Sequence, residues 1–167
     1  MLGPFRFESV AGGNVWVSFA QAAAMIRIKR AYERRARGDG RRILVERLWP
    51  RGIAKESLEA HAWMKDVAPS TELRKWFAHR VARWPEFRRR YIEELNAKSE
   101  MWTPILDASR RGAVTLLYSA HDTEHNSAVV LRDYLTRRLS RRGRSQNRAT
   151  RERAAKQRAA RRPARQS

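Results

Sequence analysis

Hydrophobic and polar residues follow two different periods between residues 25 and 139. Apolar and basic side chains alternate over 26–29, which is the pattern of a half-buried strand. Residues 43–49 begin as an apolar strand and turn polar at its end, and Val114–Tyr118 is typical of a buried parallel strand. Apolar residues at helical spacing predict helices over 55–66, after the N-cap Ser70, from Trp84-Pro85 onward, and over 102–111 and 124–139.

The order of these elements predicts a small single α/β domain. We expect a short, mainly parallel sheet of three strands or slightly more, with about five helices and a long helical excursion between the last two strands. Four tryptophans lie on the apolar stripes of the predicted helices and are expected in the core: Trp63, Trp76, Trp84 and Trp102. Trp49 differs because charged residues flank it, and we expect it to form the wall of a ligand site.

The two ends of the chain differ from this domain in composition. Residues 1–24 contain a short apolar run at 15–24 but lack the basic segment of a signal peptide, so we expect a disordered extension before a natural start at Met25. Residues 140–167 contain Arg, Ala, Gln and Ser without a large apolar side chain, and we expect a disordered tail. No stretch reaches the ~18 apolar residues of a membrane-spanning helix, so no membrane contact is expected.

The formal charge of +20 is unevenly distributed, since residues 141–167 carry eleven Lys or Arg against the single acid Glu152. Such a tail favours nonspecific nucleic-acid binding, because cations that neutralise phosphates release counterions. A solubilising appendage is the alternative. The candidate nucleic-acid contacts are Arg141, Arg142, Arg144, Arg148, Arg151 and Arg153. The chain has no cysteine, which excludes disulfides, thiolate metal sites and cysteine nucleophiles and fits a cytoplasmic protein.

Several motifs resemble one known family. They are Ile28-Lys29-Arg30, the ERLWPRG of residues 46–52, the DVAPSTELRKWF of 66–77, Ala82-Arg83-Trp84, Val114–Tyr118, Asp122, His125-Asn126 and the AVVL of 128–131. Over residues 25–139 the chain resembles the YeaO-like proteins, a family of unknown function. The wider family often carries a Cys-His-Arg cluster where Asn126-Ser127-Ala128 stand here, and a typical aspartate and proline appear as Arg80 and Val81. The resemblance therefore implies no thiol or arginine chemistry at that cluster.

Polar side chains follow the predicted strands 43–49 and 114–118. If these strands are parallel neighbours, their carboxyl ends form one crevice, as in open α/β sheets. We predict ligand-binding roles there for Arg47, Trp49, Arg51, Asp122 and Asn126, beside the N-terminus of the last helix. Two guanidinium groups and a helix N-terminus favour an anion such as a phosphate or a nucleotide. The structural alternative is that Arg47 only pairs with Glu46 or Asp122.

Three hypotheses of function follow. The leading one is an anion-binding domain with a basic tail that contacts nucleic acid. The second is a small enzyme acting on a phosphorylated or carboxylated substrate, with Glu46, Asp122 or His121 as the candidate general base. The third is an interaction protein that recruits acidic partners. No cofactor or metal is expected, because His121 and His125 lack a third ligand at a recognised spacing.

Overall fold

The computed structural model describes residues 25–160, except for the side chains of residues 142, 146–147, 149, 155–156 and 158–160. The predicted extension 1–24 and residues 161–167 of the predicted tail lie outside this range. The strands are β1 (Ile26–Arg30), β2 (Arg41–Leu44), β3 (Ala62–Trp63) and β4 (Val114–Tyr118). The α-helices are α1 (Lys55–Leu58), α2 (Thr71–Phe77), α3 (Trp84–Ala97), α4 (Ser99–Arg111) and α5 (Ser127–Ala160), and short 3₁₀ helices cover Arg37–Asp39, Lys65–Val67 and Val81–Arg83.

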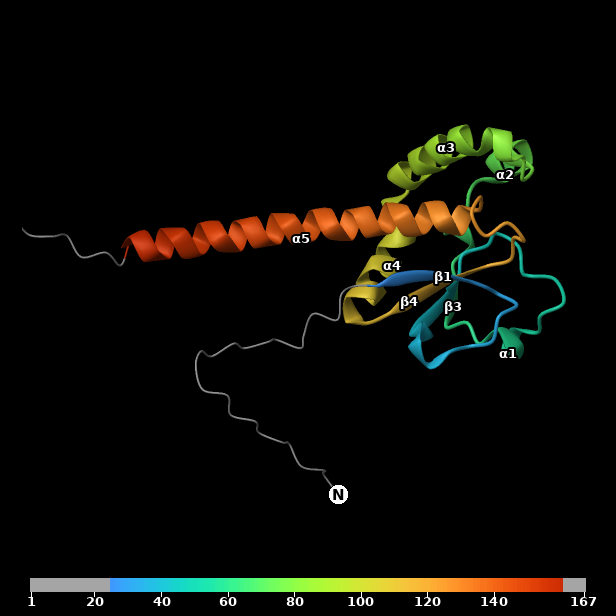
Figure 1. The fold of residues 1–167 in the computed structure, drawn as a ribbon, viewed down its shortest axis with the longest axis horizontal. Coiled ribbons are helices and arrows are strands. Elements are labelled where there is room, and N and C mark those ends of the chain that lie inside the picture. Colours follow the sequence, from blue (N-terminus) through green and yellow to red (C-terminus); the bar gives the residue numbers. More distant parts are fainter. Residues whose placement is uncertain (1–24, 161–167) are drawn as a thin grey trace, which may run out of the picture.

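The four strands form one parallel sheet in the order β1-β4-β2-β3. β4 is therefore a central strand, pairing Ile26 with Val114 on one side and Ile43 with Leu116 on the other (Figure 1). The predicted α/β fold with a parallel sheet is confirmed, with one strand more than the three that the sequence indicated.

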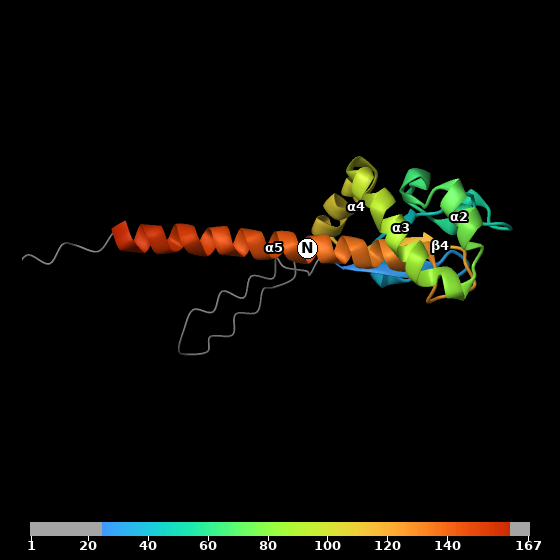
Figure 2. The same ribbon diagram turned by 90° about the horizontal axis from the view of Figure 1, so that it is seen from above.

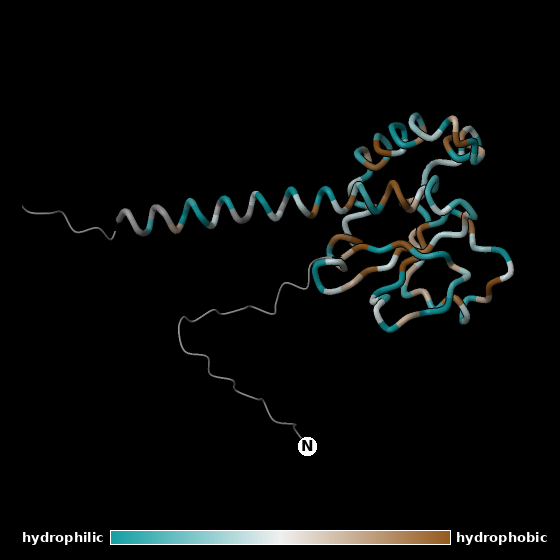
Figure 3. The backbone as a smooth tube through the Cα atoms, in the orientation of Figure 1, coloured by the Kyte–Doolittle hydropathy of each residue, from teal (hydrophilic) through white to brown (hydrophobic). Residues whose placement is uncertain are grey.

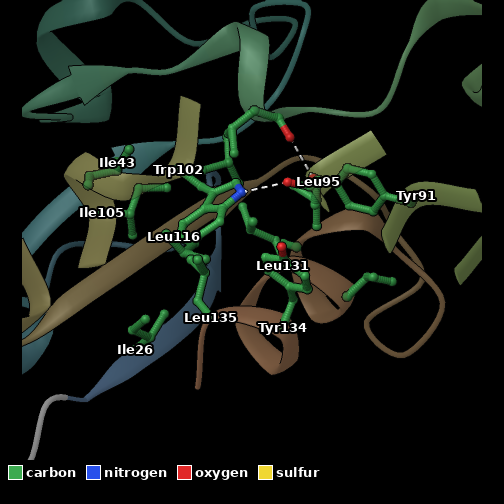
Figure 4. Packing of buried hydrophobic residues seen from close by; sticks show 14 of the residues in the cluster. Ile26, Ile43, Tyr91, Leu95, Trp102, Ile105, Leu116, Leu131, Tyr134 and Leu135 are labelled. Atoms are coloured by element: carbon green, nitrogen blue, oxygen red, sulfur yellow. Dashed lines mark hydrogen bonds between the residues drawn. The ribbon is translucent and has the colours of Figure 1, made fainter. Parts of the chain in front are cut away.

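The two faces of the sheet are covered differently, because side chains alternate along each strand. Ile43 and Leu116 lie in the main core with residues of α3, α4 and α5, and Trp102 of α4 donates a 2.7 Å hydrogen bond to the Leu95 carbonyl there (Figure 4). Leu44 and Leu117 face the other side in a smaller cluster with Ala31 and Leu58, partly covered by Trp49, Ile53 and Ala60. This second face is covered mainly by irregular chain, which leaves room for cavities.

Two elements differ from the sequence prediction. The strand predicted over 43–49 ends at Leu44, and the chain beyond it is irregular. The helix predicted over 55–66 ends at Leu58, because Glu59 takes a left-handed conformation with φ 48°, and Ala62–Trp63 then pairs with Ile43 and Leu44 as β3. The helical spacing of the apolar residues was misleading, since pairing with a distant strand decides the conformation of 62–63.

The last helix projects well beyond the rest of the molecule (Figures 1 and 2). Its first turns pack on the sheet, while its projecting part is hydrophilic (Figure 3). We expected disorder from residue 140, whereas the structure continues α5 to Ala160. Ala, Arg, Gln and Lys are strong helix formers, and Arg148 and Glu152 form an i,i+4 ion pair of 2.8 Å. No helix in the described residues has the length and apolar character needed to cross a membrane.

Candidate functional site

The carboxyl ends of β2 and β4 lie side by side, because Leu44 pairs in parallel with Leu117. The two strands meet the condition on which the predicted crevice depended. The segments that leave them, 45–54 and 119–126, enclose a cavity of about 560 Å³, which we call the crevice. It is lined by Tyr32, Glu46, Leu48, Trp49, Pro50, Arg51, Arg74, His79, Ser119, Ala120, His121 and Asp122.

A smaller cavity of about 130 Å³, the pit, adjoins the crevice. It shares Glu46, Arg74, His79, Ser119 and Ala120 with the crevice. The pit reaches the start of α5, since Asn126 and Ser127 also line it. The two cavities are therefore neighbours, and their combined lining extends from Trp49 to the N-terminus of α5.

Two arginines from distant parts of the chain line the crevice. Arg51 is exposed in the loop after β2, and Arg74 is half-buried on α2. Within residues 25–160, neither guanidinium group donates a hydrogen bond or forms an ion pair. An arginine without a protein acceptor keeps its planar set of donors available to a carboxylate or a phosphate.

The acidic residues of the crevice are held by the chain itself. Glu46 accepts a 3.0 Å hydrogen bond from the Ser119 N–H and so joins the segments that follow β2 and β4. Asp122 accepts from the N–H groups of His125 and Glu124, each at 2.8 Å, and lies 2.9 Å from His125 Nδ1. These hydrogen bonds hold the pKa of Asp122 below its ordinary value of 3.8, which makes its carboxylate a weak base.

Asn126 is the N-cap of α5 and is 3% exposed. Its Oδ1 accepts from the Val129 N–H at 3.1 Å, and its Nδ2 donates to the Asp122 carbonyl at 2.9 Å. The helix predicted over 124–139 begins three residues later than expected, at Ser127. Asp122 stabilises the turn just before the helix.

Arg47 lies outside the lining of both cavities. Its Nε donates to the Pro69 carbonyl at 3.2 Å, which fastens the strand end to the segment before α2. The ion pair considered for Arg47 with Glu46 or Asp122 is not formed among residues 25–160. Arg51 therefore has the better position for contact with a ligand in the crevice.

Sequence reasoning missed Arg74 and His79, which come from the long excursion between β2 and β4. α2 ends with Ala78 and His79 in left-handed conformations, φ 45° and 54°, and this turn brings His79 to the crevice. Arg74 lies within the DVAPSTELRKWF motif, which is the one signal in the sequence that could have drawn attention to it.

The tryptophans divide by position. Trp102 is 5% exposed, as predicted for a core residue, while Trp76 and Trp84 are half-buried against the core. Trp63 is 45% exposed, so its predicted core position is wrong, because it lies on the edge strand β3. Trp49 lines the crevice.

The histidines do not gather with other metal ligands. His121 Nδ1 lies 3.5 Å from Arg30 Nη2, whereas His125 Nδ1 contacts Asp122. In the part of the chain that the structure describes, no three His, Asp or Glu side chains come together in a way that could hold a metal ion.

A family model described as "Inactive DUF488-N3 subclade" matches residues 25–153. The uncharacterized protein YeaO of Escherichia coli (strain K12) is 44% identical over 110 residues, which cover 66% of this chain and 96% of that protein. The chain belongs to this YeaO-like family. Two mycobacterial relatives are each 38% identical to this YeaO-like chain over 113 residues, which cover 68% of this chain and 95% of theirs. They are the uncharacterized proteins Rv3073c of Mycobacterium tuberculosis (strain H37Rv) and Mb3100c of Mycobacterium bovis. No solved structure matches it.

Proposed function

We propose that the protein binds a small phosphate-bearing anion in the crevice. The observation that supports this proposal is that Arg51 and Arg74 line one cavity with their guanidinium groups free of protein acceptors among residues 25–160. Guanidinium forks match the oxygens of a phosphate in pairs, so two of them recognise such a ligand by geometry as well as by charge.

The start of α5 adds to this preference. Ser127, its first residue, lines the pit that adjoins the crevice. A helix N-terminus carries a partial positive charge and N–H groups that have no acceptor within the helix. Among the first N–H groups of α5, Asn126 accepts a hydrogen bond from that of Val129. An anion held by Arg74, which lines both cavities, would benefit from this positive end of the helix.

Binding is favoured over catalysis at this site. The candidate bases Glu46 and Asp122 both accept hydrogen bonds from backbone N–H groups, and the pKa of Asp122 is lowered. The family description also carries the word "inactive", which favours a binding role for this chain. An enzyme acting on a phosphorylated or carboxylated substrate is the second hypothesis, and substrate turnover by the wild type that is lost in Glu46→Gln would support it instead.

A thermal-stability screen with inorganic phosphate, pyrophosphate and sugar phosphates tests the binding proposal. A ligand at 100 times its Kd adds about 2.7 kcal/mol to the free energy of unfolding. We expect the phosphate ligand to stabilise the wild type and the control variant Arg111→Ala. Arg111 is exposed and precedes β4, at the end of the strand opposite to the crevice. Arg51→Ala and Arg74→Ala should lose most of the shift. Equal stabilisation of all four proteins would show that the crevice is not the site.

A second function, contact with nucleic acid, is favoured by the exposed face of α5. Five exposed arginines follow one another at alternating spacings of four and three residues, so they share one face of the helix. We call this set the arginine stripe: Arg137, Arg141, Arg144, Arg148 and Arg151. It spans roughly 21 Å at ~1.5 Å per residue. Arg148 pairs with Glu152, but both side chains are exposed, so the pair costs little to break.

Of the predicted tail contacts, Arg153 is also exposed on α5, while the side chain of Arg142 lies outside the described residues. A helix with several cations on one face matches the negative charge of a phosphate backbone without reading its sequence. The arginine stripe therefore supports the nonspecific contact that the composition of the tail predicts. An acidic protein partner, the third hypothesis, would use the same charges.

The salt dependence of duplex binding tests the arginine stripe. Each neutralised phosphate contributes about −0.9 to the slope of log K against log salt. Changing all five stripe arginines to Gln should flatten this slope by about 4.5 if each of them neutralises one phosphate. A control that changes five exposed body arginines to Gln, at positions 34, 37, 41, 80 and 111, has the same charge loss and should keep the slope. Slopes that change equally would assign the effect to net charge rather than to the stripe.

A further inference from the structure

A third cavity is also lined by Trp49. It has a volume of about 450 Å³, and we call it the tryptophan groove. Its lining consists of Trp49, Lys55, Ala60, His61, Ala62 and Trp63. The groove follows the edge strand β3, where Trp63 is 45% exposed. Neither the crevice nor the pit uses Trp63, so this large aromatic surface has no role in the function proposed above.

Hydrogen bonds fix both indole rings of the groove. Trp49 Nε1 donates to the Ile53 carbonyl at 2.7 Å, and Trp63 Nε1 donates to the Glu46 carbonyl at 2.6 Å. The ring centroids are 5.4 Å apart at an interplanar angle of 76°, an edge-to-face arrangement that does not cover the rings face to face. A planar ligand therefore meets aromatic faces that are already ordered, which lowers the entropic cost of binding.

The polar groups of the groove are a hydrogen-bond donor and a cation. His61 Nδ1 accepts from the Arg42 N–H at 3.1 Å, so in the neutral ring the proton resides on Nε2, which can donate. The Lys55 ammonium group is exposed and makes no ion pair within residues 25–160. The small side chains of Ala60 and Ala62 leave space beside Trp63. These features suit a planar heteroaromatic ring that carries acceptors and negative charge.

We propose that the tryptophan groove binds the base of a nucleotide whose phosphates occupy the crevice. Trp49 lines both cavities, so they are neighbours, and the proposed ligand would contact Arg51 in the crevice and Trp63 in the groove. Bases stack on aromatic side chains regardless of sequence because every base has a π face. This inference rests on the proposed anion site and names the ligand class that the site selects.

The test compares a nucleoside diphosphate, pyrophosphate and the free nucleoside by calorimetry and by quenching of tryptophan fluorescence. We expect the nucleoside diphosphate to bind about tenfold more tightly than pyrophosphate, a difference of ~1.4 kcal/mol within the range for base stacking. Trp63→Ala should weaken the nucleoside diphosphate about tenfold and leave pyrophosphate unchanged. Trp63→Phe, which keeps an aromatic face, should restore most of the affinity.

Val81→Ala is the matched control, since Val81 is an exposed apolar residue (54%) outside both cavities, and it should change neither affinity. If Trp63→Ala weakens neither ligand while Arg51→Ala weakens both, the groove proposal is overturned and the anion site stands. If the free nucleoside quenches wild type but not Trp63→Ala, while pyrophosphate does not bind, the groove holds a base and the anion site fails. A wild type that binds none of the three ligands overturns both proposals.

Discussion

Asp39 is the buried anion of a three-residue charge network, and its replacement by Asn is the sharpest test of what stabilises the sheet. Asp39 Oδ2 lies 2.6 Å from Arg42 Nη1 and 3.1 Å from Lys29 Nζ, on the strands β2 and β1. The side chain of Arg42 is only 2% exposed and that of Asp39 8%. Arg42 Nε is also buried without a partner among residues 25–160, so the guanidinium depends strongly on this carboxylate.

Asp39→Asn keeps the size of the side chain and removes its charge. Breaking one partner of a buried ion pair costs about 3–5 kcal/mol, because the remaining charge is uncompensated. Asn can still accept one hydrogen bond, so we expect a loss of about 3 kcal/mol in the free energy of unfolding. That is a large share of the ~5–15 kcal/mol by which proteins of this size are stable.

Urea unfolding followed by circular dichroism measures this loss as a lower midpoint at unchanged m value. Asp107→Asn is a matched control, because Asp107 and Arg110 also form an i,i+3 pair at 2.6 Å but are 45% and 38% exposed. The control should cost less than about 1 kcal/mol. The double variant Asp39→Asn/Arg42→Met removes both charges and should recover part of the loss. Equal costs for Asp39→Asn and Asp107→Asn would refute the reasoning.

Two further predictions follow from the same part of the fold. Gly40 has φ +61°, and a Cβ there would lie 2.1 Å from the Ala113 carbonyl oxygen. Gly40→Ala should therefore lower the free energy of unfolding in urea by at least ~3 kcal/mol. Gly52 also has a positive φ (+73°) but open space around it, so the control Gly52→Ala should cost only ~1 kcal/mol. Burial alone would raise the pKa of Asp39, but hydrogen bonds from the Ala36 N–H, Lys29 and Arg42 lower it below 3.8. The folded state thus binds fewer protons than the unfolded state, and this stabilisation is present above pH ~4 and lost as the pH falls through the folded pKa. The difference in urea midpoint between wild type and Asp39→Asn should therefore shrink between pH 5 and pH 2, and a constant difference would contradict the role of the carboxylate.

Local patterns predicted the positions of two strands well. β1 and β4 lie where alternation and a β-branched run indicated strands, because both are continuous segments whose burial follows from their own side chains. The mainly parallel arrangement of the sheet followed from the order of the elements. Of the residues predicted to share a crevice, Trp49, Arg51 and Asp122 line one cavity, whereas Arg47 and Asn126 do not line it.

The sequence misled where a distant partner decides the local structure. Ala62 and Trp63 fit a helical stripe, yet they become a strand because Ile43 and Leu44 offer an open edge. The same pairing exposes Trp63 and creates the tryptophan groove. Arg74 and His79 reach the crevice through the packing of α2 and a left-handed turn, neither of which has a local signature in composition.

Residues 140–160 were expected to be disordered, and the structure describes them as a continuation of α5. Low hydrophobicity indicated that this segment could not form a packed core, and the structure agrees in that the projecting part of α5 is exposed wherever its side chains are described. Helix formation does not require a core when helix-forming residues continue a helix already nucleated on the sheet. Ser127 and the packed turns after it supply that nucleus.

The central position of β4 has a consequence for how the chain folds during synthesis. β1 pairs only with β4, whereas β2 pairs with β4 on one side and with β3 on the other. β4 is the last of the four strands along the described chain, so until residue 118 has left the ribosome β1 has no partner and β2 lacks one of its two neighbours. Folding must then close a large loop, which favours slow formation of the sheet and makes N-terminal fragments prone to aggregation.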